Sequence, residues 1–219
     1  MRIAEFILQV VAVVAVFVYT YFTYRLLSAQ TQQGFENKFF QLLRFHHDIV
    51  DAVQVKIYSG ATTNIMETPT FATIAGRPAF ATFYKHFVQQ YASDYRKNPQ
   101  APVARLADEA YLSFYERHQD YLGHYFRNLY HLIKFVDNSS VDPSDKTFYT
   151  HLVRAQLSSY ELLLLFYNCH SSLGKKKFSP LIVKYALLEN MSQDNLAGRQ
   201  LKLPVDDKSL YPAGAYGES

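Results

Sequence analysis

Polar residues that could take part in chemistry recur in "GHYFRNLYHLIKFVD", residues 123–137. His124, Asn128 and His131 follow one another at steps of four and three residues, with Arg127 beside them. At 3.6 residues per turn, these steps align the side chains along one side of a helix. Histidine exchanges protons near neutral pH, and arginine binds carboxylate or phosphate through paired hydrogen bonds. The pattern is compatible with a reactive site, a surface that binds a partner, or a polar row that only fixes how helices pack.

A second row with the same spacing, Arg154, Ser158 and Glu161, lies in a later apolar segment. A carboxylate inside an apolar core needs a cation or hydrogen bonds to offset its loss of water. On a shared helix Arg154 would lie about 10 Å from Glu161 along the axis, which is far for a direct bond. We therefore predict that Arg127 pairs with Glu161 across a helix interface. Asn128 and Ser158 are expected to fill the remaining hydrogen-bonding positions.

Three interpretations of these two rows remain open. They can form a network that fixes how two helices pack, line a functional site, or face solvent without a role. Buried charges are commonly paired for structural reasons, whereas clusters of ionisable groups also mark functional sites. The residues alone favour the structural network and do not exclude the site.

The histidines do not predict a metal centre. His46 and His47 are adjacent and point in different directions on a helix, while His124 and His131 are two turns apart. No H-E-x-x-H pattern occurs, and Cys169 is the only cysteine, which excludes a cysteine-based zinc cage and an internal disulfide. We predict no metal ion and no cofactor.

Arg117 and His124, in "RHQDYLGH", match a spacing found in many helical antiviral ribonucleases, where an arginine precedes a histidine by a few residues. In a chain with eight histidines such a match arises by chance, so the motif is weak. The net charge of +3 comes from scattered residues, and we expect no direct nucleic-acid binding. A membrane-tethered nuclease therefore stays a secondary interpretation.

The first element of the chain is an N-terminal apolar segment, "FILQVVAVVAVFVYTYFTY", residues 6–24, which carries no charge. Nineteen helical residues span about 28 Å, close to the roughly 30 Å hydrocarbon core of a bilayer. Aromatic residues gather at its C-terminal end, as in an interfacial belt, and Arg25 follows. We predict a transmembrane anchor over residues 1–27. A buried core helix and a cleaved signal peptide are the alternatives. Basic residues after the segment indicate a cytoplasmic C-terminal domain.

The rest of the chain predicts an all-α fold, an antiparallel helical bundle behind one N-terminal transmembrane helix. Apolar residues repeat with a helical period, and the expected helices cover residues 35–57, 76–97, 103–136, 144–172 and 178–191. The helix over residues 144–172 should be the central buried one, because "LLLLFY" is apolar all round. Residues 58–76 are expected to form a loop with room for a short strand. The predicted boundaries are 1–27 for the anchor, 34–192 for the helical domain and 193–219 for a loosely ordered tail.

Five blocks of the sequence, in order, resemble the phage abortive infection (AbiC-like) family. The blocks are "FENKFFQLLRFHHDIV", "GRPAF", "HYFRNLYHLIKFVD", "RAQLSSYELLLLFYNC" and "FSPLIVKYALLENM". The resemblance covers residues 34–192, and "YFRNLY" and "RAQLSSYELLLLFYN" are its most specific parts. It implies one or more transmembrane helices before a helical cytoplasmic domain, at the bacterial inner membrane. It also implies anti-phage defence through death or arrest of the infected cell.

The resemblance also carries the family's characteristic polar positions onto this chain. These positions are Arg127, Asn128, Arg154, Gln156, Ser158, Glu161 and Asn168. Together with His124, which comes from spacing alone, these eight residues are called the polar seam below. The resemblance implies no catalytic mechanism for them.

Three functions are compatible with the sequence. The favoured one is a non-enzymatic membrane effector that compromises the inner membrane when infection is sensed. The alternatives are the membrane-tethered nuclease and a sensor or regulatory subunit of a multi-component retron or toxin–antitoxin system. Similar short membrane proteins occur beside reverse transcriptases in retron defence systems, where they act as toxic effectors. The expected partners are membrane lipid, a reverse transcriptase or other neighbouring gene product, and further copies of this chain.

Overall fold

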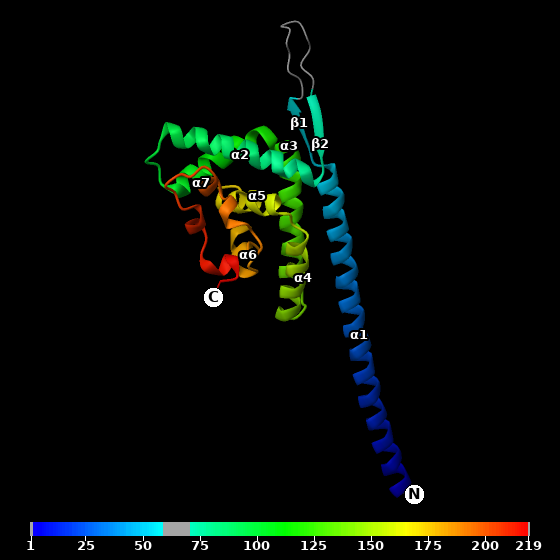
Figure 1. The fold of residues 1–219 in the computed structure, drawn as a ribbon. Helices are drawn as coiled ribbons and strands as arrows, with labels where there is room; N and C mark the ends of the chain where they lie inside the picture. The colour runs from blue at the N-terminus through cyan, green and yellow to red at the C-terminus, as the bar shows by residue number, and fades with distance from the viewer. Residues whose placement is uncertain (1, 59–70, 219) are drawn as a thin grey trace. The chain divides into compact units, whose positions relative to one another are not determined.

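The computed structural model describes residues 2–58 and 71–218, and the chain divides into two compact units, Met1–Leu42 and Leu43–Ser219. Helices dominate both units (Figure 1). The predicted all-α fold is confirmed, since the described residues contain seven α-helices and a sheet of only two strands.

The first helix, α1, runs without interruption from Arg2 to Ala52. Its residues 6–24 are exposed throughout, and among the described helices α1 is the one long and apolar enough to cross a membrane. The separate helix predicted over residues 35–57 is therefore wrong at both ends. No proline interrupts the chain before Ala52, so the helix continues. It ends there because the alternating β-branched and aromatic residues of "QVKIY" favour a strand.

A small antiparallel hairpin follows α1. It consists of β1 (Gln54–Tyr58) and β2 (Phe71–Ala75), with Val55 opposite Ile74. The Gly76 N–H donates to the Val53 carbonyl oxygen at 2.8 Å and closes the base of the hairpin. The loop predicted over residues 58–76 thus ends in a strand, and its middle, residues 59–70, lies outside the described residues.

The next two helices, α2 (Arg77–Lys97) and α3 (Val103–Asp137), lie where the sequence predicts them. Pro99 and Pro102 in the short connection prevent α2 from continuing. The two helices pack through aromatic rings: the ring centre of Phe87 lies 5.7 Å from that of Phe114 and 4.3 Å from that of Tyr167 on α5. These rings join α2, α3 and α5 in one aromatic core.

The single helix predicted over residues 144–172 is instead two helices, α4 (Pro143–Ala155) and α5 (Ser159–His170). Ser158 caps α5. Its hydroxyl accepts the N–H of Glu161 at 3.4 Å, and the Glu161 carboxylate accepts the N–H of Ser158 at 2.8 Å. This reciprocal capping box satisfies N–H groups that the start of a helix leaves unpaired. The sequence signal for the break is "SSYE", which matches S-x-x-E.

The predicted helix over residues 178–191 is correct only for α6, Ser179–Lys184. Ala186 has a φ of +48°, which a right-handed helix does not contain. The guanidinium of Arg154 donates to the Ala186 carbonyl oxygen at 3.0 Å and holds this bend against α4. The chain then continues as the short helices η1 (Gln193–Asn195), α7 (Ala197–Gln200), η2 (Asp207–Leu210) and η3 (Ala213–Tyr216).

The C-terminal segment, predicted as a loosely ordered tail over residues 193–219, is packed in the structure as far as it is described. Asp207 is buried and accepts the hydroxyls of Tyr91 at 2.6 Å and Tyr167 at 2.9 Å, and the N–H of Gly198 at 2.7 Å. The sequence did not reveal this order because the tail's partners lie in α2 and α5, far away in sequence. The other domain boundaries, at residues 27 and 34, stay predictions.

The central position of α5 predicts that shortening one of its buried side chains lowers the stability of the fold. Leu164 has no exposed surface, so Leu164→Ala should lower the free energy of unfolding by about 2–5 kcal/mol. Chemical unfolding of the purified protein, followed by circular dichroism, measures the change. Leu173→Ala is the matched control, because Leu173 is 48% exposed and should change stability little. Equal effects of the two substitutions would contradict the central burial of α5.

Candidate functional site

The carboxylate of Glu161 is the buried centre of the polar seam. It has no exposed surface, and its Oε1 accepts the Tyr125 hydroxyl at 3.0 Å while Oε2 accepts the Ser158 N–H at 2.8 Å. The predicted Arg127–Glu161 pair is wrong. Arg127 is exposed, and its Nε donates to the Gly123 carbonyl oxygen of its own helix at 3.3 Å. Because Ser158 is the N-cap of α5, Glu161 turns back over the helix start, where backbone N–H groups stabilise a carboxylate.

Asn128 of the polar seam contacts the C-terminal part of α1 within the second unit. Its Oδ1 lies 3.0 Å from Nδ1 of His46, and the His46 ring centre lies 5.3 Å from that of Tyr125. We call His46, Tyr125, Asn128, Ser158 and Glu161 the buried polar cluster. Burial lowers the pKa of His46, while Asn128 and the charge of Glu161 oppose this shift. The cluster therefore connects α1, α3 and α5 through hydrogen bonds and a neutral histidine.

Arg154 and Gln156 belong to a different contact. Arg154 is buried and pairs with Glu189 rather than with any residue of the buried polar cluster. Its second hydrogen bond goes to the Ala186 carbonyl oxygen, as described above. Gln156 is half-buried and follows the last residue of α4. These two residues therefore fix the segment after α6 against α4.

Arg127 and Asn168, with His131, line a surface pocket of about 360 Å³ between α3 and the turn that follows α5. Asn168 is 5% exposed, and its amide nitrogen donates to the Tyr111 hydroxyl at 3.1 Å. Gly174 lets the turn approach α5 closely, since a Cβ there would lie 2.7 Å from the Asn168 carbonyl oxygen. The pocket thus combines a fixed amide with exposed basic side chains.

His124 lies apart from these groups. It lines a smaller, mainly apolar pocket of about 230 Å³ with Ile49 of α1 and Tyr121. The polar seam is therefore not one site but four places: the buried polar cluster, the Arg154 contact, the pocket beside Arg127, and the surface at His124.

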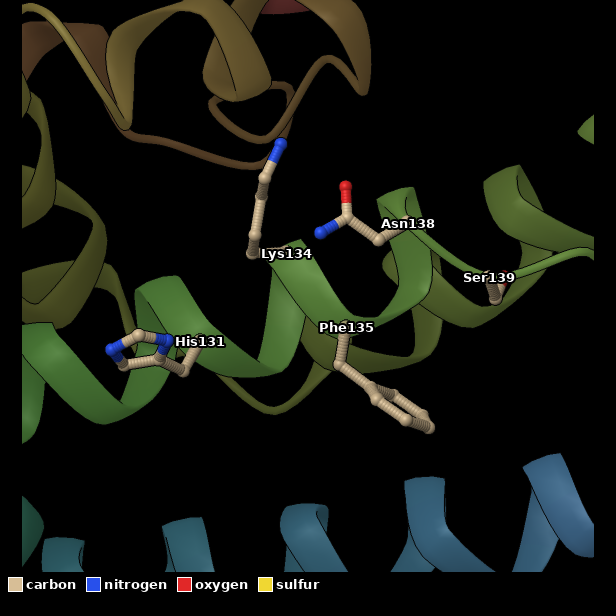
Figure 2. A pocket seen from close by; sticks show the side chains of 5 residues that line it. All are labelled: His131, Lys134, Phe135, Asn138 and Ser139. Carbon is tan, nitrogen blue, oxygen red and sulfur yellow. The ribbon is translucent and has the colours of Figure 1, made fainter.

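A further pocket lies near the C-terminal end of α3. Figure 2 shows Lys134 and Asn138 extending from the same side of the helix, while Phe135 points the other way. Lys134 pairs with Asp137 at 3.0 Å, and Lys184 pairs with the same carboxylate at 2.6 Å. Partial burial alone would raise the pKa of Asp137, but the hydrogen bonds from Lys184 and Lys134 lower it to about 2. This cluster is satisfied internally and has the character of a structural link between α3 and α6.

The structure also brings together two histidines that the sequence did not connect. His86 of α2 and His118 of α3 stack with ring centres 5.3 Å apart and line a surface pocket with Arg117. Burial lowers the pKa of His118 to about 4, with the charges of His86 and Arg117 adding to the shift. The ring of His118 also contacts Phe83 and lies close to the aromatic core. No spacing within either helix could have paired the two histidines.

A family model described as "Putative phage abortive infection protein" matches residues 117–196. The predicted family resemblance is confirmed for this segment. Searches of curated proteins and of solved structures gave no match. The matched segment includes the whole polar seam, which runs from His124 to Asn168. The chain thus resembles abortive infection proteins over α4, α5, α6 and most of α3.

The geometry at Glu161 predicts that replacing Glu161 lowers stability much more than replacing Arg127. Glu161→Ala removes the capping carboxylate and leaves the Tyr125 hydroxyl unpaired, so stability should fall by roughly 2–4 kcal/mol. Arg127→Ala, at an exposed position, should change it by no more than about 0.5 kcal/mol. Urea unfolding of both variants tests this. Comparable losses in the two variants would favour a direct Arg127–Glu161 pair and contradict the bonds of Glu161 to Tyr125 and Ser158.

The neutral histidines predict a loss of stability in mild acid. The pKa of His118 is about 4 in the folded chain and about 6.5 in the unfolded one, so between these values the unfolded chain binds more protons. The free energy of unfolding should therefore decrease as the pH falls from 6.5 to 4. His46, His86 and His170, whose pKa values are also lowered, act in the same direction.

Melting temperatures measured between pH 7 and pH 4 test this pH dependence. His118→Gln should flatten the decrease relative to the unmodified chain, whereas His131→Gln, at an exposed histidine, should not. A decrease of the same steepness in all three proteins would show that His118 does not contribute.

Proposed function

We propose that this protein is a membrane-anchored effector of anti-phage defence, which kills or arrests the infected cell by compromising the inner membrane. The observation that carries the proposal is the stretch 6–24 of α1, in which every side chain is exposed. Large apolar residues such as Phe6, Phe17 and Phe22 are each more than 60% exposed there. Apolar surface of this extent is unfavourable in water and is favourable inside lipid.

The continuity of α1 supports an effector in which sensing and membrane action are coupled. One helix carries both the apolar stretch and His46, which belongs to the buried polar cluster. A change in the contacts of His46 with α3 would therefore act on the helix that enters the lipid. The basic residues after residue 24 support a single-pass arrangement with the helical unit in the cytoplasm.

The segment that matches the abortive infection family supports the defence role. Experiments on membrane and RNA integrity distinguish the two ways in which the protein could kill the cell. The pair His86 and His118 beside Arg117 is the observation that favours the alternative, a membrane-tethered nuclease. Neutral histidines can act as proton acceptors, and arginine can stabilise phosphate charge. Intact transfer and ribosomal RNA in dying cells would count against the nuclease. Damaged RNA together with an intact membrane would count against the membrane effector.

A charge placed in the middle of the apolar stretch tests the anchor. Val14→Lys should reduce membrane insertion, because a lysine at the centre of a membrane helix costs about 2.5–3.5 kcal/mol. We expect the protein to be lost from the membrane fraction and phage protection to be lost. Uptake of a permeability dye by infected cells, which reports membrane damage, should also be lost. Val14→Leu, which keeps the apolar surface, should retain all three.

The experiment uses cells that express the chain alone or with its genomic neighbours. Protection only with neighbours would support a partner such as a reverse transcriptase or another nearby gene product. Full protection by a Val14→Lys protein recovered entirely in the soluble fraction would overturn the membrane mechanism.

A further inference from the structure

The pocket beside Arg127 has the features of a binding site. Its volume of about 360 Å³ falls within the range of roughly 300–1,000 Å³ that is usual for small-molecule sites. One wall is α3, which contributes Phe126 and Tyr130, and the opposite wall is the turn after α5, which contributes Lys177 and Phe178. The two walls come from different parts of the fold and meet where the rings of Tyr130 and Phe178 contact each other.

The ionisable side chains that line this pocket include basic residues but no carboxylate. Arg127, His131 and Lys177 line it, and no Asp or Glu is among the residues that do. In the part of the chain that the structure describes, neither Arg127 nor Lys177 forms an ion pair. By contrast, Lys134 and Lys184 nearby both pair with Asp137. The Nε of Arg127 donates to the Gly123 carbonyl oxygen, which leaves the terminal guanidinium nitrogens and the Lys177 ammonium group without a carboxylate partner within the described ranges and able to bind an anionic ligand.

The remaining walls are aromatic and amide groups. The rings of Tyr130 and Phe178 meet edge to face with centres 5.5 Å apart, and Tyr115 and Phe126 lie beside them. The buried amide of Asn168 also lines the pocket. Aromatic rings stack on planar bases, and a fixed amide can form hydrogen bonds with the edge of a base.

We propose that this pocket binds a free nucleotide, with its phosphate at Arg127 and Lys177 and its base against the partly exposed ring of Tyr130. Arginine and lysine are the usual protein partners of phosphate, and the aromatic walls distinguish a nucleotide from phosphate alone. This pocket lies outside the buried polar cluster. The proposal concerns binding by the purified chain, so its outcome is independent of how the protein kills cells.

Calorimetric titration of the full chain, purified in a non-ionic detergent, tests the proposal. The probes are ATP, AMP, inorganic phosphate and vesicles containing phosphatidylglycerol. We expect a nucleotide to bind at least about tenfold more tightly than inorganic phosphate, and more weakly as salt increases. Absence of binding by both nucleotides at millimolar concentration would overturn the proposal. Preferential binding of the vesicles would also overturn it and assign the pocket to a lipid headgroup.

Variants separate the phosphate and base contacts. Arg127→Gln combined with Lys177→Gln should weaken nucleotide binding by about tenfold or more, because it removes two charge-assisted contacts. Lys176→Gln is the matched control, since it removes a neighbouring exposed lysine that does not line the pocket. Tyr130→Leu should weaken nucleotide binding but leave the affinity for inorganic phosphate unchanged. Melting curves establish that each variant is folded, and unchanged nucleotide affinity in the folded double variant would refute the site.

Discussion

The burial of the Glu161 carboxylate is the constraint on which the packing of the second unit depends. A carboxylate without water requires donors on both oxygens, and here they come from the Tyr125 hydroxyl on α3 and the Ser158 N–H at the start of α5. These two bonds define where α5 begins and how α3 lies against it. The break between α4 and α5 follows, because Ser158 cannot cap α5 and also continue α4 as a helix.

Tyrosine hydroxyls take the role that cations often have in buried networks. Glu161 receives one hydroxyl, and Asp207 receives those of Tyr91 and Tyr167. The chain contains 18 tyrosines and no tryptophan, so hydroxyl donors are frequent along its core helices. Because neutral donors satisfy these carboxylates, Arg127 is not needed inside the core and lies at the surface. The basic side chains of Arg127 and Lys177 therefore stay at the pocket beside α3, without a carboxylate partner among the described residues.

The segment that matches the abortive infection family contains both Glu161 and most of this pocket. Part of its characteristic sequence is therefore explained by packing: the capping box and the buried amide of Asn168 have structural partners within the segment or just before it. Arg127 is exposed and bonds to the Gly123 carbonyl oxygen of its own helix, and the role proposed for it is ligand binding. His46, outside the match, joins the network from α1.

Helical periodicity predicted the all-α fold, the bounds of α2 and α3 and the apolar N-terminal stretch, because each depends on local patterns within one segment. The capping box at Ser158 was also legible as S-x-x-E, although the apolar run around it suggested a continuous helix. Other features depend on side chains that are distant in sequence. The partners of Glu161, the pairing of His86 with His118 and the order of the tail around Asp207 all join separate helices. Spacing along one helix predicts which side chains share a face. It does not predict which donor on another helix will form a hydrogen bond with that face.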